Sequence, residues 1–175
     1  GADLSYFPKT GLYLGQLDST QPSLVVVPEL RWLSDSGDTK VQISAFGRFD
    51  SADKNRKHVD LREAYLRHEF NDFSVLVGIN KVFWGVAESR HLVDIINQVD
   101  QLEYTDGNAR LGQPMLSLTT DQDWGTLSAF LMTRFQKLDF PGPDGRLRGG
   151  LPVSDTNFFS HASGHKAKDY AVRYY

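Results

Sequence analysis

The chain of 175 residues contains no cysteine at all. It therefore forms no disulfide, has no thiolate to bind a metal ion and has no cysteine nucleophile. It also lacks a large charge of one sign, because its formal net charge is -3. A nucleic-acid-binding protein usually carries a broad basic field, so we expect no nucleic-acid partner.

Long hydrophobic runs are absent too. No stretch approaches the roughly 20 apolar residues that a transmembrane helix requires. A transmembrane β-barrel still fits the mean hydropathy of -0.39, because barrel strands alternate apolar residues outward with polar residues inward. Aromatic residues make up 12% of the chain, which suits the aromatic girdles of such barrels.

Alternation with a period of two is the dominant pattern that the chain does show. Residues 61–83 hold two such runs, joined by a tight polar turn at 69–72. Successive side chains of a strand leave opposite faces, so the pattern predicts an antiparallel hairpin. Its apolar face is expected to comprise Ala64, Leu66, Val75, Val77 and Ile79.

The same alternation recurs along the chain. It predicts about seven to eight strands and an all-β, antiparallel up-and-down meander. Pro28 interrupts one run and predicts a bulge or a locally unpaired edge, since proline cannot donate to the ladder. The further runs are residues 11–17 (a weak candidate), 24–33, 40–49, 114–120, 126–136 and 169–175.

The connections alternate in length. Short turns at 34–38, 69–72 and 121–125 alternate with longer loops at 50–58, 84–113 and 139–165. In a meander, alternate connections lie at opposite ends of the sheet, so one end should carry all the long loops. Outer-membrane barrels show this asymmetry, with short periplasmic turns and longer extracellular loops.

Three segments resemble a family of porin-like outer-membrane β-barrels of Gram-negative bacteria, classed under a domain of unknown function. They are LREAYLRHEF at 61–70, VLVGINKVFWGVAES at 75–89 and HLVDIINQVD at 91–100, and LGQPML and DWGTLSAFLMTRF are similar in kind. Asn80-Lys81 and Gln98-Val99 depart from the family pattern, which has Arg-Gln and Asn-Pro there. The resemblance implies that residues 1–175 are one barrel domain, the N-terminal portion of a larger barrel in outer-membrane lipid. The family has no settled biochemical activity.

In such a barrel the polar strand faces would line the lumen. Basic residues dominate these faces, and rings of Arg and Lys favour anions in pores. We therefore predict a channel or transport protein for small solutes, including anionic or amphipathic ones, and a homo-oligomer is compatible with this class. The alternative is that Arg31, Glu63 and Arg67 form a cross-strand ladder that braces the wall. The lumen set is Arg31, Lys40, Arg48, Glu63, Arg67, Asn80, Arg134 and Arg173.

The long loop after residue 83 holds further polar candidates. Solute-binding residues tend to lie on loops that a rigid scaffold positions, so this loop is expected to fold into the lumen as a constriction. The alternative is an ordered extracellular cap. The candidates are Trp84, Glu88, Arg90, His91, Asp94 and Asn97.

Enzymatic motifs are weak. His161 and His165 lie near Ser160 and Ser163, but no G-x-S-x-G elbow accompanies them, and their zinc-like spacing has no partner ligand pair. We expect no enzyme, no metal site and no cofactor. The alternative from another class is a soluble antiparallel domain that binds a ligand or partner such as a carbohydrate, with its apolar faces forming a dry core against a second sheet.

Overall fold

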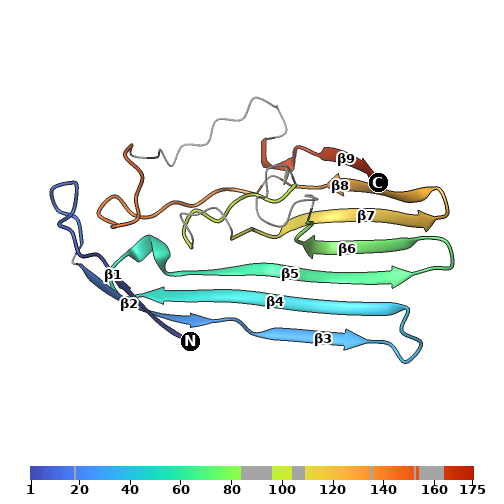
Figure 1. Cartoon of the computed structure of the whole chain (residues 1–175), viewed down its shortest axis with the longest axis horizontal. Coiled ribbons are helices and arrows are strands. Elements are labelled where there is room, and N and C mark those ends of the chain that lie inside the picture. The colour runs from blue at the N-terminus through green and yellow to red at the C-terminus, as the bar shows by residue number, and fades with distance from the viewer. Residues whose placement is uncertain (18, 84–95, 104–108, 135, 152, 154–163) are drawn as a thin grey trace.

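The computed structural model describes residues 1–17, 19–83, 96–103, 109–134, 136–151, 153 and 164–175. These residues form one antiparallel sheet of nine strands, which confirms the all-β antiparallel prediction (Figure 1). None of their helices is long and apolar enough to span a membrane. The strands are β1 (Ala2–Tyr6), β2 (Thr20–Val26), β3 (Glu29–Leu33), β4 (Thr39–Asp50), β5 (His58–Glu69), β6 (Ser74–Asn80), β7 (Gln113–Gln122), β8 (Gly125–Met132) and β9 (Asp169–Tyr174), with short 3-10 turns η1 (Lys54–Arg56) and η2 (Gly164–Lys166).

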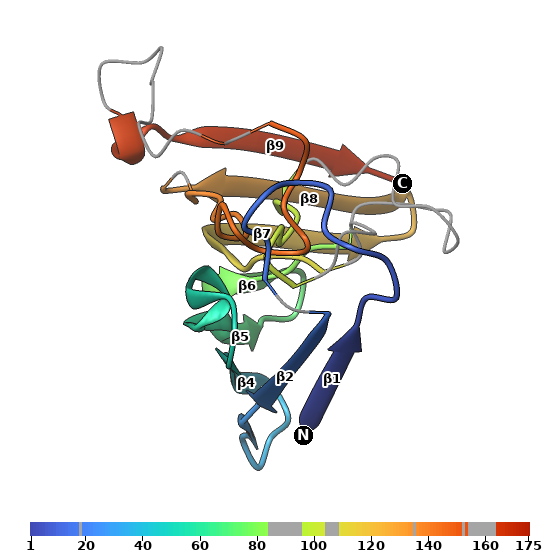
Figure 2. The same ribbon diagram turned by 90° about the vertical axis from the view of Figure 1, so that its left-hand side faces the viewer.

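The strands follow one another across the sheet as a meander. Their order is β1-β2-β4-β5-β6-β7-β8-β9, and β3 lies beside β2 along the same edge of β4. The sheet twists but is not closed into a barrel, and β1 and β9 lie at its two sides (Figure 2).

Pro28 divides the run that the sequence presents as one strand. β2 ends at Val26 and β3 begins at Glu29. Pro28 has no N–H to donate, but its carbonyl still accepts a hydrogen bond from the Ala45 N–H at 3.1 Å. The predicted local loss of pairing is therefore confirmed, and it separates two strands.

Two strand predictions were wrong, and one strand was missed. Residues 11–17 form no strand, since Gly15 turns the chain at φ +83° and the Gln16 N–H bonds back to the Tyr13 carbonyl at 3.3 Å. β1 was not predicted at all, although its whole length pairs with residues 20–24 of β2. β8 ends at Met132, four residues before the predicted end at Gln136. With β2 and β3 counted separately, the sheet has nine strands instead of about seven or eight.

Connection length separates the two ends of the sheet as predicted. The hairpins β3–β4, β5–β6 and β7–β8 turn tightly at the right-hand end in Figure 1. The described parts of the connections β1–β2, β4–β5, β6–β7 and β8–β9 lie toward the opposite end, and the last two connections are the longest in sequence.

The long connections at this end bond to one another. The Leu17 N–H donates to the Asp144 carbonyl at 2.9 Å, and Gln16 Nε2 donates to the Gly145 carbonyl at 3.1 Å. Nearby, the Gly142 N–H donates to the Asp53 carboxylate at 3.1 Å. Segments from the beginning, middle and end of the chain thus form one loop layer.

One face of the sheet is apolar and exposed. The register places Leu66 opposite both Val41 and Val77, and Ala64 opposite Ile79, as the alternation predicts. Val77 is 52% exposed and Leu118 is 48% exposed, and no second sheet covers them in the part of the chain that the structure describes. A single row of this face crosses seven strands through Trp32, Val41, Leu66, Val77, Leu116, Leu131 and Tyr170.

The other face is mainly polar and is partly buried. A small apolar cluster of Leu76, Met115, Phe130 and Met132 packs there against Ile96 from the β6–β7 connection. Among the described residues, 15 polar or charged side chains are buried against six hydrophobic ones. The polarity is inverted relative to a sheet that packs in water, where the apolar face is the covered one.

Candidate functional site

A β-bulge shapes the polar face between β4 and β5. Ser44 lies opposite Glu63, whereas its neighbour Ala45 lies opposite Leu61, so Arg62 is an extra residue on β5. A bulge locally disrupts the alternation and re-aims a side chain. Arg62 and Glu63 consequently line the same pocket although they are adjacent in the sequence.

Residues 96–103 lie over this face and are bound to it by arginines. Arg62 forms a buried ion pair with Asp100, and its Nε lies 3.3 Å from the Asp60 carboxylate. Arg56 Nε donates to the Leu102 carbonyl at 3.1 Å. These bonds attach the connection to the wall of the sheet.

Arg48 is the most highly connected of these arginines. Its guanidinium lies 2.8 Å from the Glu103 carboxylate and 2.9 Å from that of Asp3, and it donates to Ser23 Oγ at 2.6 Å. The side chains of Arg48 and Glu103 are 5% and 2% exposed. One arginine on β4 thus joins β1, β2 and the overlying connection.

Asp100 also shapes the turn that carries Glu103. Its Oδ1 accepts the backbone N–H of Leu102 at 2.9 Å and that of Glu103 at 3.3 Å. An aspartate that bonds the backbone two residues ahead makes a local Asx-type turn. Its other oxygen remains for Arg62, so one carboxylate sets both the turn and its attachment.

Asn97 holds the start of this segment to the end of β6. Its Oδ1 accepts the Val82 N–H at 2.7 Å, and its Nδ2 donates to the carbonyls of Asn80 at 3.1 Å and Leu111 at 3.0 Å. Asn97 is buried, so its amide satisfies backbone groups that water does not reach.

Replacing Asn97 with alanine is expected to lower the free energy of unfolding by about 1–3 kcal/mol, because buried backbone groups lose their partners. Denaturant titration of the variant measures this loss. Asn71→Ala in the exposed β5–β6 turn is the control and should change little. Equal stability of the two variants would show that Asn97 does not hold the segment.

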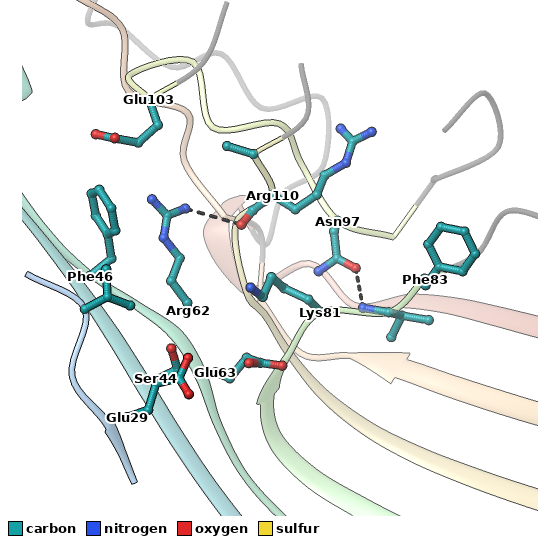
Figure 3. Close-up of a pocket in the computed structure, with 13 residues that line it drawn as sticks. Glu29, Ser44, Phe46, Arg62, Glu63, Lys81, Phe83, Asn97, Glu103 and Arg110 are labelled. Carbon is teal, nitrogen blue, oxygen red and sulfur yellow. Dashed lines mark hydrogen bonds between the residues drawn. The ribbon is translucent and has the colours of Figure 1, made fainter. Parts of the chain in front are cut away.

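A pocket of about 490 Å³ opens between the polar face of the sheet and residues 96–103 of the β6–β7 connection (Figure 3). Its floor is the cross-strand row Glu29, Ser44 and Glu63 on β3, β4 and β5. Residues 81–83, which follow β6, form one side, and Phe46 and Arg62 form another. The Arg62 guanidinium lies 4.7 Å from the Phe46 ring centroid, within the range of a cation–π interaction.

The predicted lumen residues occupy the polar face with one exception. Register places Arg31, Lys40, Arg67 and Asn80 there together with Glu63, Arg48 and Arg173. Arg134 instead follows the end of β8 as an exposed residue, because the strand is shorter than predicted.

The cross-strand ladder suggested for Arg31, Glu63 and Arg67 does not form. Arg31 pairs with Glu29 at 2.9 Å, and Arg67 pairs with Glu69 at 3.0 Å, in each case two residues away on the same strand. Both pairs are exposed.

Of the loop candidates, the structure describes Asn97 alone, and its amide is engaged by backbone. Trp84, Glu88, Arg90, His91 and Asp94 lie outside the described residues, as do Ser160, His161 and Ser163 and the side chain of His165. In the ranges that are described, no group of three or more His, Asp or Glu side chains could hold a metal ion.

Sequence reasoning missed Arg62, Arg56 and Glu103. By strict alternation Arg62 would share the apolar face of Ala64 and Leu66, and only the bulge turns it inward. A lone arginine among apolar positions was the available signal of that bulge. No family model, curated protein or solved structure matches this chain, so its function is inferred from its own geometry.

Proposed function

We propose that the chain forms part of the wall of a β-barrel in the outer membrane of a Gram-negative bacterium, and that this barrel is a porin-like channel for small solutes. The observation that carries the proposal is the inverted polarity of the sheet: an apolar face is exposed across seven strands, whereas the buried side chains of the opposite face are mostly polar or charged.

The apolar face favours lipid over water. Soluble monomers rarely expose contiguous apolar patches larger than roughly a few hundred Å². Exposed apolar surface costs about 25 cal/mol per Å² in water, and contact with acyl chains removes that cost. A ladder-paired sheet also satisfies its backbone groups in lipid, provided that further pairing closes its edges into a barrel.

Aromatic side chains gather near the end with short turns. Trp124 of the β7–β8 turn stacks with Tyr174 at a centroid distance of 6.1 Å, and Phe70 stacks with Phe73 in the β5–β6 turn at 4.6 Å. Such residues mark the membrane–water interface in barrels. The short turns would then face the periplasm and the long loops the cell exterior.

The polar face would line the lumen, and residues 96–103 would narrow it. Their attachment by Arg48, Arg56 and Arg62 makes this connection part of the inner wall. The carboxylates of Glu103, Asp50 and Asp100 offset these three positive charges. At this level the lumen would therefore select small polar and amphipathic solutes by shape and local contacts more than by a ring of positive charge.

Reconstitution of the purified protein into planar bilayers tests the proposal. We expect discrete conductance steps, together with swelling of protein-containing vesicles in an isotonic solution of a small sugar. Vesicles without protein are the control. A folded chain that stays monomeric in buffer without detergent, and that conducts nothing, would instead support a soluble ligand-binding domain.

A further inference from the structure

Glu63 brings a carboxylate without a partner into the pocket. The residue is half-buried on β5, directly opposite Ser44 of β4, whose own side chain is buried. The Glu63 side chain makes no hydrogen bond or ion pair within the described part of the chain, whereas Glu29 on the same floor pairs with Arg31. A partly desolvated carboxylate gains most from a cationic partner.

Lys81 supplies the opposite charge at the rim. It follows the end of β6, lines the same pocket and makes no hydrogen bond or ion pair with another described residue. Figure 3 shows Lys81 and Glu63 on the same cavity, with the Arg110 guanidinium pointing away from the floor.

The other charges of the pocket are already engaged. Arg62 is paired with Asp100 and Asp60, and Glu103 is paired with Arg48. One carboxylate and one ammonium group thus remain for a ligand. Apolar surface from Phe46, Val82 and Phe83 lies on the same cavity.

From this arrangement we infer that the pocket binds a zwitterionic small molecule, an apolar amino acid or a short peptide. Its ammonium group lies against Glu63, its carboxylate against Lys81, and its apolar part against Phe46. A simple anion would meet Glu63 unfavourably and a simple cation would meet Lys81 unfavourably, so only a ligand with both charges satisfies both residues. The volume of about 490 Å³ lies within the range of roughly 300–1,000 Å³ that is usual for small-molecule sites.

The inference rests on the proposed function for the route by which the ligand arrives, because a channel delivers solutes to its own wall. It refines the expectation of an anion-selective lumen, since the two charges left without partners have opposite sign. Binding itself is measured separately from transport.

Calorimetric titration of the detergent-solubilised protein with three related probes tests the inference. The probes are phenylalanine, N-acetylphenylalanine, which lacks the ammonium group, and phenylalaninamide, which lacks the carboxylate. We expect phenylalanine to bind about tenfold more tightly than either derivative, because each derivative loses one charge-assisted contact. Equal binding of all three probes, or no binding of phenylalanine at millimolar concentration, would overturn the inference without any variant.

Two variants assign the contacts. Glu63→Gln should weaken phenylalanine and phenylalaninamide about tenfold, because it removes the partner of the ammonium group. It should not weaken N-acetylphenylalanine, which has no ammonium group and whose carboxylate Glu63 repels. Lys81→Gln should weaken phenylalanine and N-acetylphenylalanine and spare phenylalaninamide. Glu69→Gln, on the same strand but outside the pocket, is the matched control and should alter none of the three. The same loss for all probes in both variants would contradict the assigned contacts.

The result separates the inference from the proposed function. Conductance without phenylalanine binding would leave the channel intact and refute the zwitterion site. Binding without conductance would support the site and refute the channel.

Discussion

Replacing Arg48 with methionine is expected to lower the free energy of unfolding by about 3–5 kcal/mol, because removal of one member of a buried ion pair leaves the other charge uncompensated. The charge left behind is the Glu103 carboxylate, which is 2% exposed and lies 2.8 Å from Arg48. Ser23 and Asp3 lose their contacts with the same guanidinium. Methionine keeps much of the length of the side chain, so the loss of charge dominates the effect.

Arg67→Met is the matched control for this prediction. Arg67 is paired with Glu69, but their side chains are 45% and 56% exposed. Exposed pairs contribute about 0–1 kcal/mol, so the control should stay within that range of the native protein. Denaturant titration in detergent measures both variants. Equal losses for Arg48→Met and Arg67→Met would show that the buried network does not stabilise the fold.

Replacing Val77 with arginine is expected to destabilise the protein by about 2–4 kcal/mol in phospholipid vesicles, which is the cost of an arginine on the lipid face near the bilayer midplane. Val77 lies on β6 between Leu66 and Leu116, in the central row of the apolar face. If this face met water, an exposed valine could become arginine at a cost of roughly 0.5 kcal/mol or less.

Asn71→Arg tests whether position matters for the added charge. Asn71 is exposed in the short β5–β6 turn, outside the apolar band, so arginine there should cost little in vesicles. Refolding from urea into vesicles measures both variants. A Val77→Arg protein that refolds as well as Asn71→Arg would argue against a lipid-facing sheet.

The regular part of the fold was accessible from the sequence. A period of two assigns each residue of a strand to a face, so Leu66, Val75 and Val77 could be placed on one side before any register was known. Turn chemistry then determined which ends of the sheet carry short hairpins. These are local properties, and local properties can be read from neighbouring residues.

The departures from that pattern were less accessible. Arg62 breaks the alternation by one residue. The neighbouring residues do not indicate whether the strand has a bulge there or whether the arginine side chain lies on the apolar face. The segment 2–6 is short and contains the polar residues Asp3 and Ser5, so it gives a weak strand signal. It nevertheless forms β1, because β2 provides a strand edge with which it can pair. Residues 11–17 alternate but contain Gly15, whose positive φ favours a turn.

The pocket depends on contacts between distant segments. Arg48 and Glu103 are 55 positions apart, and Arg62 and Asp100 are 38 apart. Charge alone does not say which carboxylate meets which arginine, so the sequence could not show that Arg48 is neutralised and that Glu63 is not. For that reason the prediction of a basic lumen treated every charged residue on the polar face alike, whether or not it is paired in the structure.

The bonds between the long connections carry a consequence for the order of folding. Gln16 and Gly145 meet across 129 positions of sequence, whereas each hairpin of the sheet joins neighbouring segments. Closing so long a loop in an unfolded chain loses more entropy than closing a hairpin, although the cost rises slowly with length. The paired strands between the two residues must first bring them together. We therefore expect the loop layer to assemble after the sheet, as a late step that depends on the hairpins beneath it, and to be the first part to separate when the sheet loosens.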